Sequence, residues 1–121
     1  MLCTGGNCRD NLRKMMSQKT NVKDICTTGS ECERVIFLHN DGTISCTDPW
    51  LLENTDGHRF VRLLGHFYYS VLAQTEENTI IPVISSFTQS DVDRISGWKG
   101  VQSFAMGQKN DSAPFAIAVT E

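Results

Sequence analysis

The chain lacks several features that would identify its class at once. Its longest apolar runs, at residues 35–38 and 80–84, are far shorter than the roughly 18 residues that a membrane-spanning helix needs. There is no low-complexity tract, and 40% of the residues are hydrophobic, which argues against wholesale disorder. With 121 residues, the chain is long enough for one ordinary core and too short for two. We therefore expect one domain and no membrane span.

Targeting and nucleotide-binding motifs are missing as well. The first 23 residues are polar and then basic, without the apolar stretch of about 7 to 15 residues that a secretory signal requires. A cytoplasmic location is therefore expected. Gly5-Gly6 lacks the Gly-Lys-Ser/Thr ending of a phosphate-binding loop, and no GxGxxG run occurs. No heptad pattern or internal repeat indicates a coiled coil or a solenoid.

Cysteine, by contrast, is concentrated near the N-terminus. Four of the five thiols form two short polar loops, each with a glycine between its cysteines: Cys3, Cys8, Cys26 and Cys32. Four thiolates can close a tetrahedral zinc site, although the gaps of four and five residues exceed the usual spacing of roughly two to four. Three interpretations stay open: unmodified thiols, structural zinc, or two small disulfides. A cytoplasmic location favours the first two.

Charge is unevenly distributed along the chain, although the net charge is only -3. Residues 1–23 carry five basic residues against Asp10, whereas residues 24–56 carry seven acidic residues against Arg34. Such segments usually present surfaces that complement each other within the fold or between subunits. A nucleic-acid-binding domain is normally more basic, so no nucleic-acid partner is expected.

The succession of apolar patterns predicts an α+β fold: a single small domain with a mainly antiparallel sheet of about five strands and helices packed on one face. Residues 1–33 are expected to form a cysteine-containing N-terminal segment, with a short helix at residues 9–18 and a loop at residues 19–33. This segment belongs to the same domain as an α+β core at residues 34–121.

The strongest local signal is a β-hairpin at residues 34–47, where two β-prone runs flank Asn40-Asp41-Gly42. A two-residue loop and a three-residue loop give opposite registers, because a slip of one residue inverts every side chain. A three-residue loop with Gly42 in the left-handed region separates apolar from polar side chains more cleanly. This register is predicted, and its apolar face carries Ile36, Leu38, Ile44 and Cys46.

Residues 58–75 are predicted to form the central amphipathic helix, because apolar residues recur there at steps of three and four. The opposite face of that helix would carry four polar side chains: His58, Arg62, His66 and Tyr69. Guanidinium and imidazole groups can hold a phosphate or carboxylate. These four residues are the predicted ligand-binding residues, and an ordinary solvated helix face is the alternative interpretation.

The rest of the chain is expected to contain a strand at residues 79–87, a short helix at residues 92–98 and a final hairpin. Pro82 cannot donate to a ladder, which places the first of these strands at an edge, a bulge or a strand start. Thr88 with Asp91, or Ser90 with Asp93, would start the helix.

The final hairpin is predicted from strands at residues 101–106 and 114–119. In the second strand, larger apolar residues alternate with two alanines: Phe115, Ile117 and Val119 with Ala116 and Ala118. This pattern suggests one face on the core and the other against a close neighbour such as a second subunit.

No set of acid, base and nucleophile is apparent, so we expect a non-enzymatic binding or regulatory protein, such as an inhibitor or accessory domain. Its partner would be another protein or a small anionic ligand, and homo-oligomers are conceivable through the C-terminal strand. An alternative is a protein that binds a small anion or nucleotide on the basic face at residues 58–75, and a virus-encoded antagonist of a host system would also suit such a compact chain. A second alternative is a cysteine-dependent enzyme using Cys8, whose pKa would be lowered by Arg9 and a helix start. The expected cofactor is none, or structural zinc held by the four cysteines.

Overall fold

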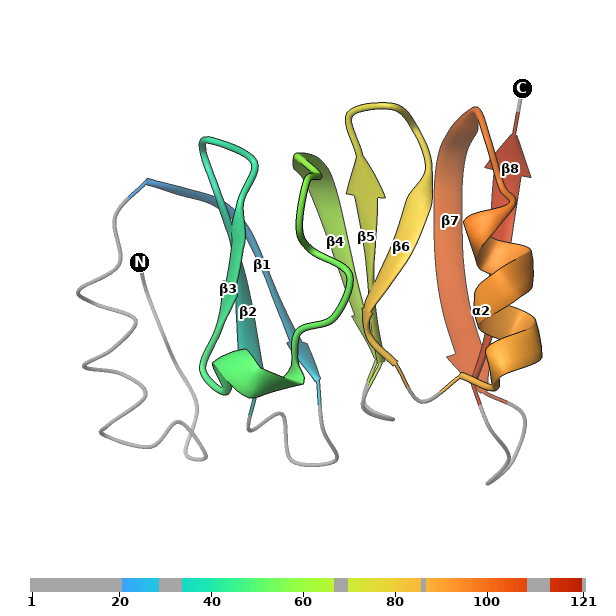
Figure 1. Ribbon diagram of the computed structural model, residues 1–121, viewed down its shortest axis with the longest axis horizontal. Helices are drawn as coiled ribbons and strands as arrows, with labels where there is room; N and C mark the ends of the chain where they lie inside the picture. The colour runs from blue at the N-terminus through green and yellow to red at the C-terminus, as the bar shows by residue number, and fades with distance from the viewer. Residues whose placement is uncertain (1–20, 29–33, 67–69, 86, 109–113, 121) are drawn as a thin grey trace.

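The computed structural model describes residues 21–28, 34–66, 70–85, 87–108 and 114–120, which form three small antiparallel sheets (Figure 1). The first sheet has the order β1 (Val22–Thr28), β2 (Arg34–His39), β3 (Ile44–Cys46). The second has the order β4 (Phe60–His66), β5 (Ser70–Thr75), β6 (Ile80–Ile84). The third pairs β7 (Val101–Gln108) with β8 (Pro114–Thr120). The described connections include a 3-10 turn, η1 (Pro49–Leu51), and a helix, α2 (Gln89–Ser96).

The predicted fold class is therefore wrong. The expected single sheet with helices on one face is replaced, in the part of the chain described, by three sheets and one short α-helix. Figure 1 shows the first, second and third sheets from left to right, with α2 at the right of the molecule. No described helix is long and apolar enough to cross a membrane.

The main error concerns residues 58–75, where the structure has the β4–β5 hairpin instead of a helix. Every residue of β5 is buried, because the strand lies between two apolar clusters. Val71 and Ala73 belong to the cluster shared with the first sheet, whereas Leu72 belongs to the cluster shared with α2 and β7. A strand buried on both faces lacks a simple alternation of apolar and polar residues, so its run of apolar residues imitated helical spacing.

The first and second sheets meet where β1 lies beside β4. The Leu63 N–H donates to Asp24 Oδ2 at 3.2 Å, which uses a backbone donor at the edge of β4 that β5 does not occupy. Two residues further on, a Cβ atom at Gly65 would lie 2.2 Å from the Thr27 carbonyl oxygen. Only glycine permits this approach of one backbone to the other.

β1 itself was not predicted, since residues 19–33 were expected to form a loop. The strand pairs antiparallel with β2, with Cys26 opposite Ile36. This pairing joins residues 22–28 of the N-terminal segment to the core sheet. The predicted helix at residues 9–18 lies outside the described residues.

The register predicted for the 34–47 hairpin is confirmed. Ile36 pairs with Cys46 and Leu38 with Ile44, and all except the half-buried Ile44 are buried. The three-residue loop closes with a hydrogen bond from the His39 N–H to the Thr43 carbonyl oxygen at 2.8 Å. Gly42 has φ +86°, the left-handed conformation that this loop requires.

Three further predictions are confirmed. β6 contains Pro82, forms an edge of the second sheet, and shows a register irregularity against β5. Thr88 caps α2 by accepting a hydrogen bond at Oγ1 from the Asp91 N–H at 3.2 Å, although the helix begins at Gln89, earlier than predicted. β7 and β8 form the expected C-terminal hairpin.

The third sheet is tied to the second by polar groups around the first residue of β7. The Gln74 side chain, on β5, donates from Nε2 to the Val101 carbonyl oxygen at 2.8 Å in a buried position. The Val101 N–H in turn donates to the Asn78 carbonyl oxygen at 2.9 Å. Both backbone groups of Val101 are thereby satisfied where the residue is buried.

Gly65→Ala should destabilise the protein by about 1–3 kcal/mol, because the added methyl group forces apart two backbones that no side-chain rotation can separate. Urea unfolding followed by circular dichroism measures the change. Gly97→Ala is the matched control: its Cβ would meet nothing closer than 3.5 Å, so the free energy of unfolding should change by less than about 0.5 kcal/mol. Equal effects of the two substitutions would contradict the proposed role of Gly65.

Candidate functional site

An open pocket of about 670 Å³ lies between β6, the loop that precedes β4, and α2. The loop contributes Glu53, Asn54 and His58. Residues 79–82, at the start of the edge strand β6, line one side. The lining is completed by two residues that precede α2 and four on α2 itself: Ser85, Phe87, Gln89, Val92, Asp93 and Ser96. Its volume falls within the range of roughly 300–1,000 Å³ that is common for small-molecule sites.

The loop is held against β6 by backbone contacts. The Glu53 N–H donates to the Val83 carbonyl oxygen at 2.8 Å, on the side of β6 that β5 leaves open. Asn54 and Gly57 adopt φ values of +59° and +79°, which turn the chain back toward β4. The ring of His58 then lies 6.0 Å from the ring of Phe60, at an interplanar angle of 47°. The contact places the His58 ring next to the buried Phe60, at the pocket.

The orientation of α2 is set by its one buried residue, Ile95, which packs in the cluster with Leu72, Ile80 and Val101. Residues three and four apart share a face of a helix. The side that lines the pocket accordingly carries Gln89, Val92, Asp93 and Ser96. Gln89 Nε2 donates to Asp93 Oδ1 at 2.9 Å, which holds the carboxylate in place.

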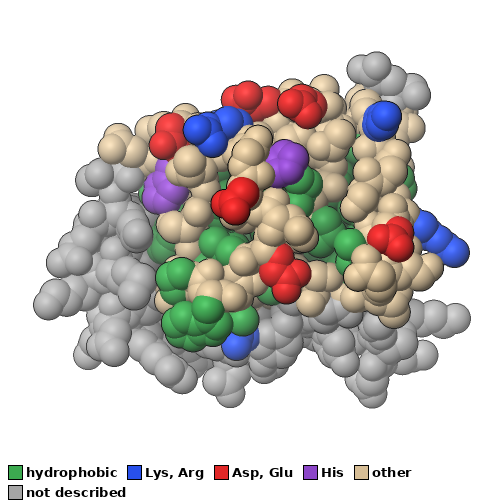
Figure 2. All heavy atoms as spheres, viewed as in Figure 1, with side chains coloured by type: hydrophobic (Ala, Val, Ile, Leu, Met, Phe, Trp, Pro, Cys, Tyr) green, Lys and Arg blue, Asp and Glu red, His purple; other side chains and the backbone are tan. Residues whose placement is uncertain are grey.

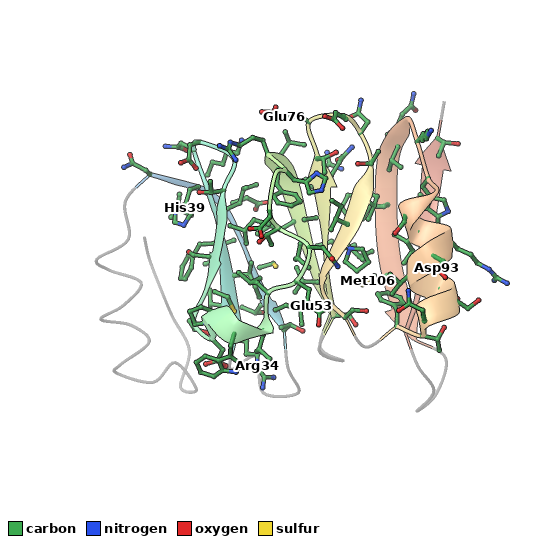
Figure 3. All side chains as sticks on the ribbon, in the orientation of Figure 1. Arg34, His39, Glu53, Glu76, Asp93 and Met106 are labelled. Carbon is green, nitrogen blue, oxygen red and sulfur yellow. The ribbon has the colours of Figure 1, made fainter. Side chains whose placement is uncertain are left out.

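The pocket lining is mainly polar, with two acidic side chains and a smaller apolar surface. Ile80, Ile81 and Pro82 contribute apolar surface from β6, with Phe87 and Val92 opposite. Among the described residues, the ionisable lining groups are the carboxylates of Glu53 and Asp93 and the imidazole of His58, without a lysine or arginine. Figure 2 shows apolar side chains at the surface between acidic ones on this face, and Figure 3 labels Glu53 on the loop and Asp93 on α2.

The four predicted ligand-binding residues are not grouped by a helix, because that helix does not form. His58 lines the pocket, Arg62 is exposed on β4, and His66 is the last residue of that strand. Two residues four apart on a strand are separated by about 13 Å, so Arg62 and His66 are further apart than predicted. Tyr69 lies outside the described residues. A role for these side chains in ligand binding stays a prediction, without the helical argument that supported it.

Sequence reasoning missed Glu53 and Asp93 as pocket residues. Asp93 could be placed on a helix by local signals, since Thr88 and the apolar spacing around Val92 are visible in the sequence. Glu53 carries no such signal, because it lies in an irregular loop that is held against β6 by the hydrogen bond of its backbone N–H to Val83.

Of the four cysteines predicted as metal ligands, Cys26 alone is described. Ile36 on β2 lies opposite Cys26 on one side and opposite Cys46 on the other. Burial, with smaller contributions from Asp24 and Cys46, raises the pKa of Cys26 to about 12. A thiol in such surroundings is protonated at neutral pH and is a weak nucleophile.

The wider zinc prediction concerns residues beyond this part of the chain. Among the described residues, no group of three His, Cys, Asp or Glu side chains could hold a metal ion. Cys3, Cys8 and Cys32 lie outside the described residues, so structural zinc and a nucleophilic Cys8 stay predictions.

Comparison with known proteins identifies no relative: no family model, curated protein or solved structure matches the chain. Function must be argued from the pocket and surfaces of this chain.

Cys26 should react with iodoacetamide far more slowly in the folded protein than in urea. Its pKa of about 12, against an ordinary 9.0, lowers the thiolate fraction at pH 8 roughly a thousandfold. Peptide mapping by mass spectrometry measures the rate, and the unfolded protein supplies the reference. A folded-state rate close to the unfolded one would show that Cys26 is accessible and able to ionise.

The same shift predicts a pH dependence of stability. Because the unfolded thiol ionises first, the contribution of Cys26 is fully present below about pH 9 and is lost as the pH rises toward 12. Urea unfolding of the wild type and of Cys26→Ala at pH 7, 9 and 10.5 measures how the contribution of Cys26 to the free energy of unfolding changes with pH. The stability difference between the two should shift toward the variant as the pH rises, and a constant difference would contradict the assignment.

Proposed function

We propose that the protein is a small non-enzymatic binding protein whose pocket between β6 and α2 holds an organic cation, such as a protonated amine or guanidinium on a short aliphatic stem. The observation that carries this proposal is the lining: two carboxylates beside a patch of apolar residues, with no lysine or arginine among the described residues that line the pocket. The apolar surface would take the stem, and Glu53 and Asp93 would attract the charge.

The polar groups of the pocket are arranged so that acceptors are left for a ligand. Several hydroxyls are already engaged: Ser96 donates to the Val92 carbonyl oxygen at 2.8 Å, and the Thr79 hydroxyl contacts the Thr75 hydroxyl at 2.7 Å. The Glu53 carboxylate, in contrast, has no hydrogen bond or ion pair with any described residue. Asp93 keeps Oδ2 after accepting from Gln89 at Oδ1.

The same lining argues against the small anionic ligand expected from the sequence, because an anion would lie near two like charges without a cation to compensate. Electrostatics alone would not hold a cation tightly, since exposed charge pairs contribute only about 0.2–1 kcal/mol each. Burial of the aliphatic stem would supply about 0.8 kcal/mol per CH₂. The preferred ligands should therefore combine both features.

Titration with three ligands of one shape tests this idea: n-butylamine, 1-butanol and butyrate at neutral pH. We expect amide shifts in NMR spectra at Ile81, Val92 and neighbouring pocket residues, with affinity in the order amine, alcohol, carboxylate. Raising the salt concentration should weaken amine binding and leave the alcohol unaffected, because salt screens exposed charges. Butyrate binding as tightly as butylamine would refute the cation proposal.

Charge-neutralising substitutions provide the second test. Glu53→Gln and Asp93→Asn should each weaken butylamine binding about two- to fivefold, the range expected for one exposed charge pair. Glu76→Gln and Asp56→Asn are matched controls, since both residues are exposed and neither lines the pocket. Equal losses in the control variants would show that only the net charge matters and that the pocket is not the site.

A further inference from the structure

The C-terminal hairpin has large apolar side chains on its outer face and small ones on its inner face. Phe115, Ile117 and Val119 are 48%, 60% and 59% exposed. Ala116 and Ala118 instead pack against the cluster that contains Ile95 and Val101. The sequence pattern correctly predicted two distinct faces, and the structure shows that the alanines face the core.

The neighbouring strand does not cover this apolar row, which we call the β8 row (Phe115, Ile117 and Val119). Opposite it on β7 lie Gly107, Ala105 and Ser103, all small. Only Phe115 has close cover, since its ring lies over Gly107, where an added Cβ would be 2.6 Å from the Phe115 ring.

The edge of β8 also lacks the usual protection against pairing. Among the described residues, β8 pairs with β7 alone, so alternate residues direct their N–H and C=O groups away from the sheet. Natural edge strands are commonly protected by charged side chains, prolines or bulges. β7 and β8 contain no charged residue. The one proline, Pro114, stands at the start of β8, and the register irregularity of the hairpin lies at its other end, between Val101 and Ser103 of β7.

We propose that β8 pairs antiparallel with β8 of a second copy of the chain, about a two-fold axis at Ile117. The argument for a second copy is that the strand is self-complementary in size and charge. In this register Phe115 lies opposite Val119 of the partner subunit, Ile117 opposite Ile117 of the partner subunit, and Ala116 opposite Ala118 of the partner subunit. Large side chains meet large ones on the outer face, and alanines meet on the inner face.

The absence of charged residues from β8 matters because the proposed dimer is symmetric. In this two-fold register residue 117 meets its own copy, so a charged residue at the axis would face a like charge. β8 has the uncharged Ile117 at that position and no charged residue elsewhere along its length. The result is a four-stranded sheet, β7-β8-β8-β7, whose outer face carries two β8 rows in contact. This interface does not involve the pocket residues and does not rest on the cation proposal.

Sedimentation velocity over a concentration series up to about 1 mM, which reaches weak dimers, tests the proposal on the full chain. The wild type should show a monomer–dimer equilibrium. Ile117→Lys should weaken the dimer at least tenfold, because it places two like charges at the axis. Val61→Lys is the control, since Val61 is also exposed, at 42%, but lies on β4; it should leave the equilibrium unchanged.

Mixing two charge variants then tests the position of the axis. Ile117→Glu alone should also be monomeric, whereas an equimolar mixture with Ile117→Lys should form a heterodimer, because residue 117 meets its own counterpart. Circular dichroism checks that each variant is folded. If a charged variant does not fold, Ile117→Thr replaces it, because threonine keeps a β-branched side chain but removes apolar surface. A monomeric wild type, a dimer disrupted by Val61→Lys, or no rescue in the mixture would overturn the proposal; a monomer would leave the β8 row to a different protein.

Discussion

The close approach of β1 to β4 at Gly65 is the constraint on which much of the structure depends. It brings the first sheet against the second, so that Ile36 and Cys46 from one sheet pack in the same cluster as Phe60 and Val71 from the other. Any side chain at position 65 would meet the backbone of β1. The Asp24 carboxylate completes the junction by accepting the Leu63 N–H at the edge of β4. The two sheets share no ladder of backbone hydrogen bonds. They meet through one hydrogen bond and through the close approach that glycine permits at position 65.

β5 connects two apolar clusters of the molecule, because it contributes buried residues to both. Its residues alternate between the cluster shared with the first sheet and the cluster shared with α2 and the C-terminal hairpin, which explains why polar Gln74 is buried and bonded to β7. The pocket forms where the second cluster ends, since Ile80 belongs to both the cluster and the pocket lining. The β8 row lies on the far face of the third sheet. The two proposed surfaces are therefore physically separate.

Local sequence patterns correctly predicted the elements that bury only one face or that begin at a distinctive residue. The 34–47 hairpin has one buried face, so its register followed from Ile36, Leu38 and the position of Gly42. Thr88 marked the start of α2, and Pro82 marked an edge strand. The prediction was wrong for β4 and β5, because a strand buried on both faces has no period of two. Gly65 and the β-branched Val61 and Val71 are weak helix formers and were the available warning. His58, which lines the pocket, was predicted as a ligand-binding residue from a helix that does not form, and Glu53 had no detectable signal.

The sequence by itself determined the turns, caps and hairpin register, because these depend on the conformational preferences of residues close together in the chain. It also determined that β8 would have two unlike faces, through the alternation of Ala116 and Ala118 with larger residues. Only the tertiary structure decided which face is exposed, that β1 pairs with β2, and that Glu53 and Asp93 share a pocket. Each of these depends on how whole elements pack against one another, which the conformational preferences of single residues do not specify.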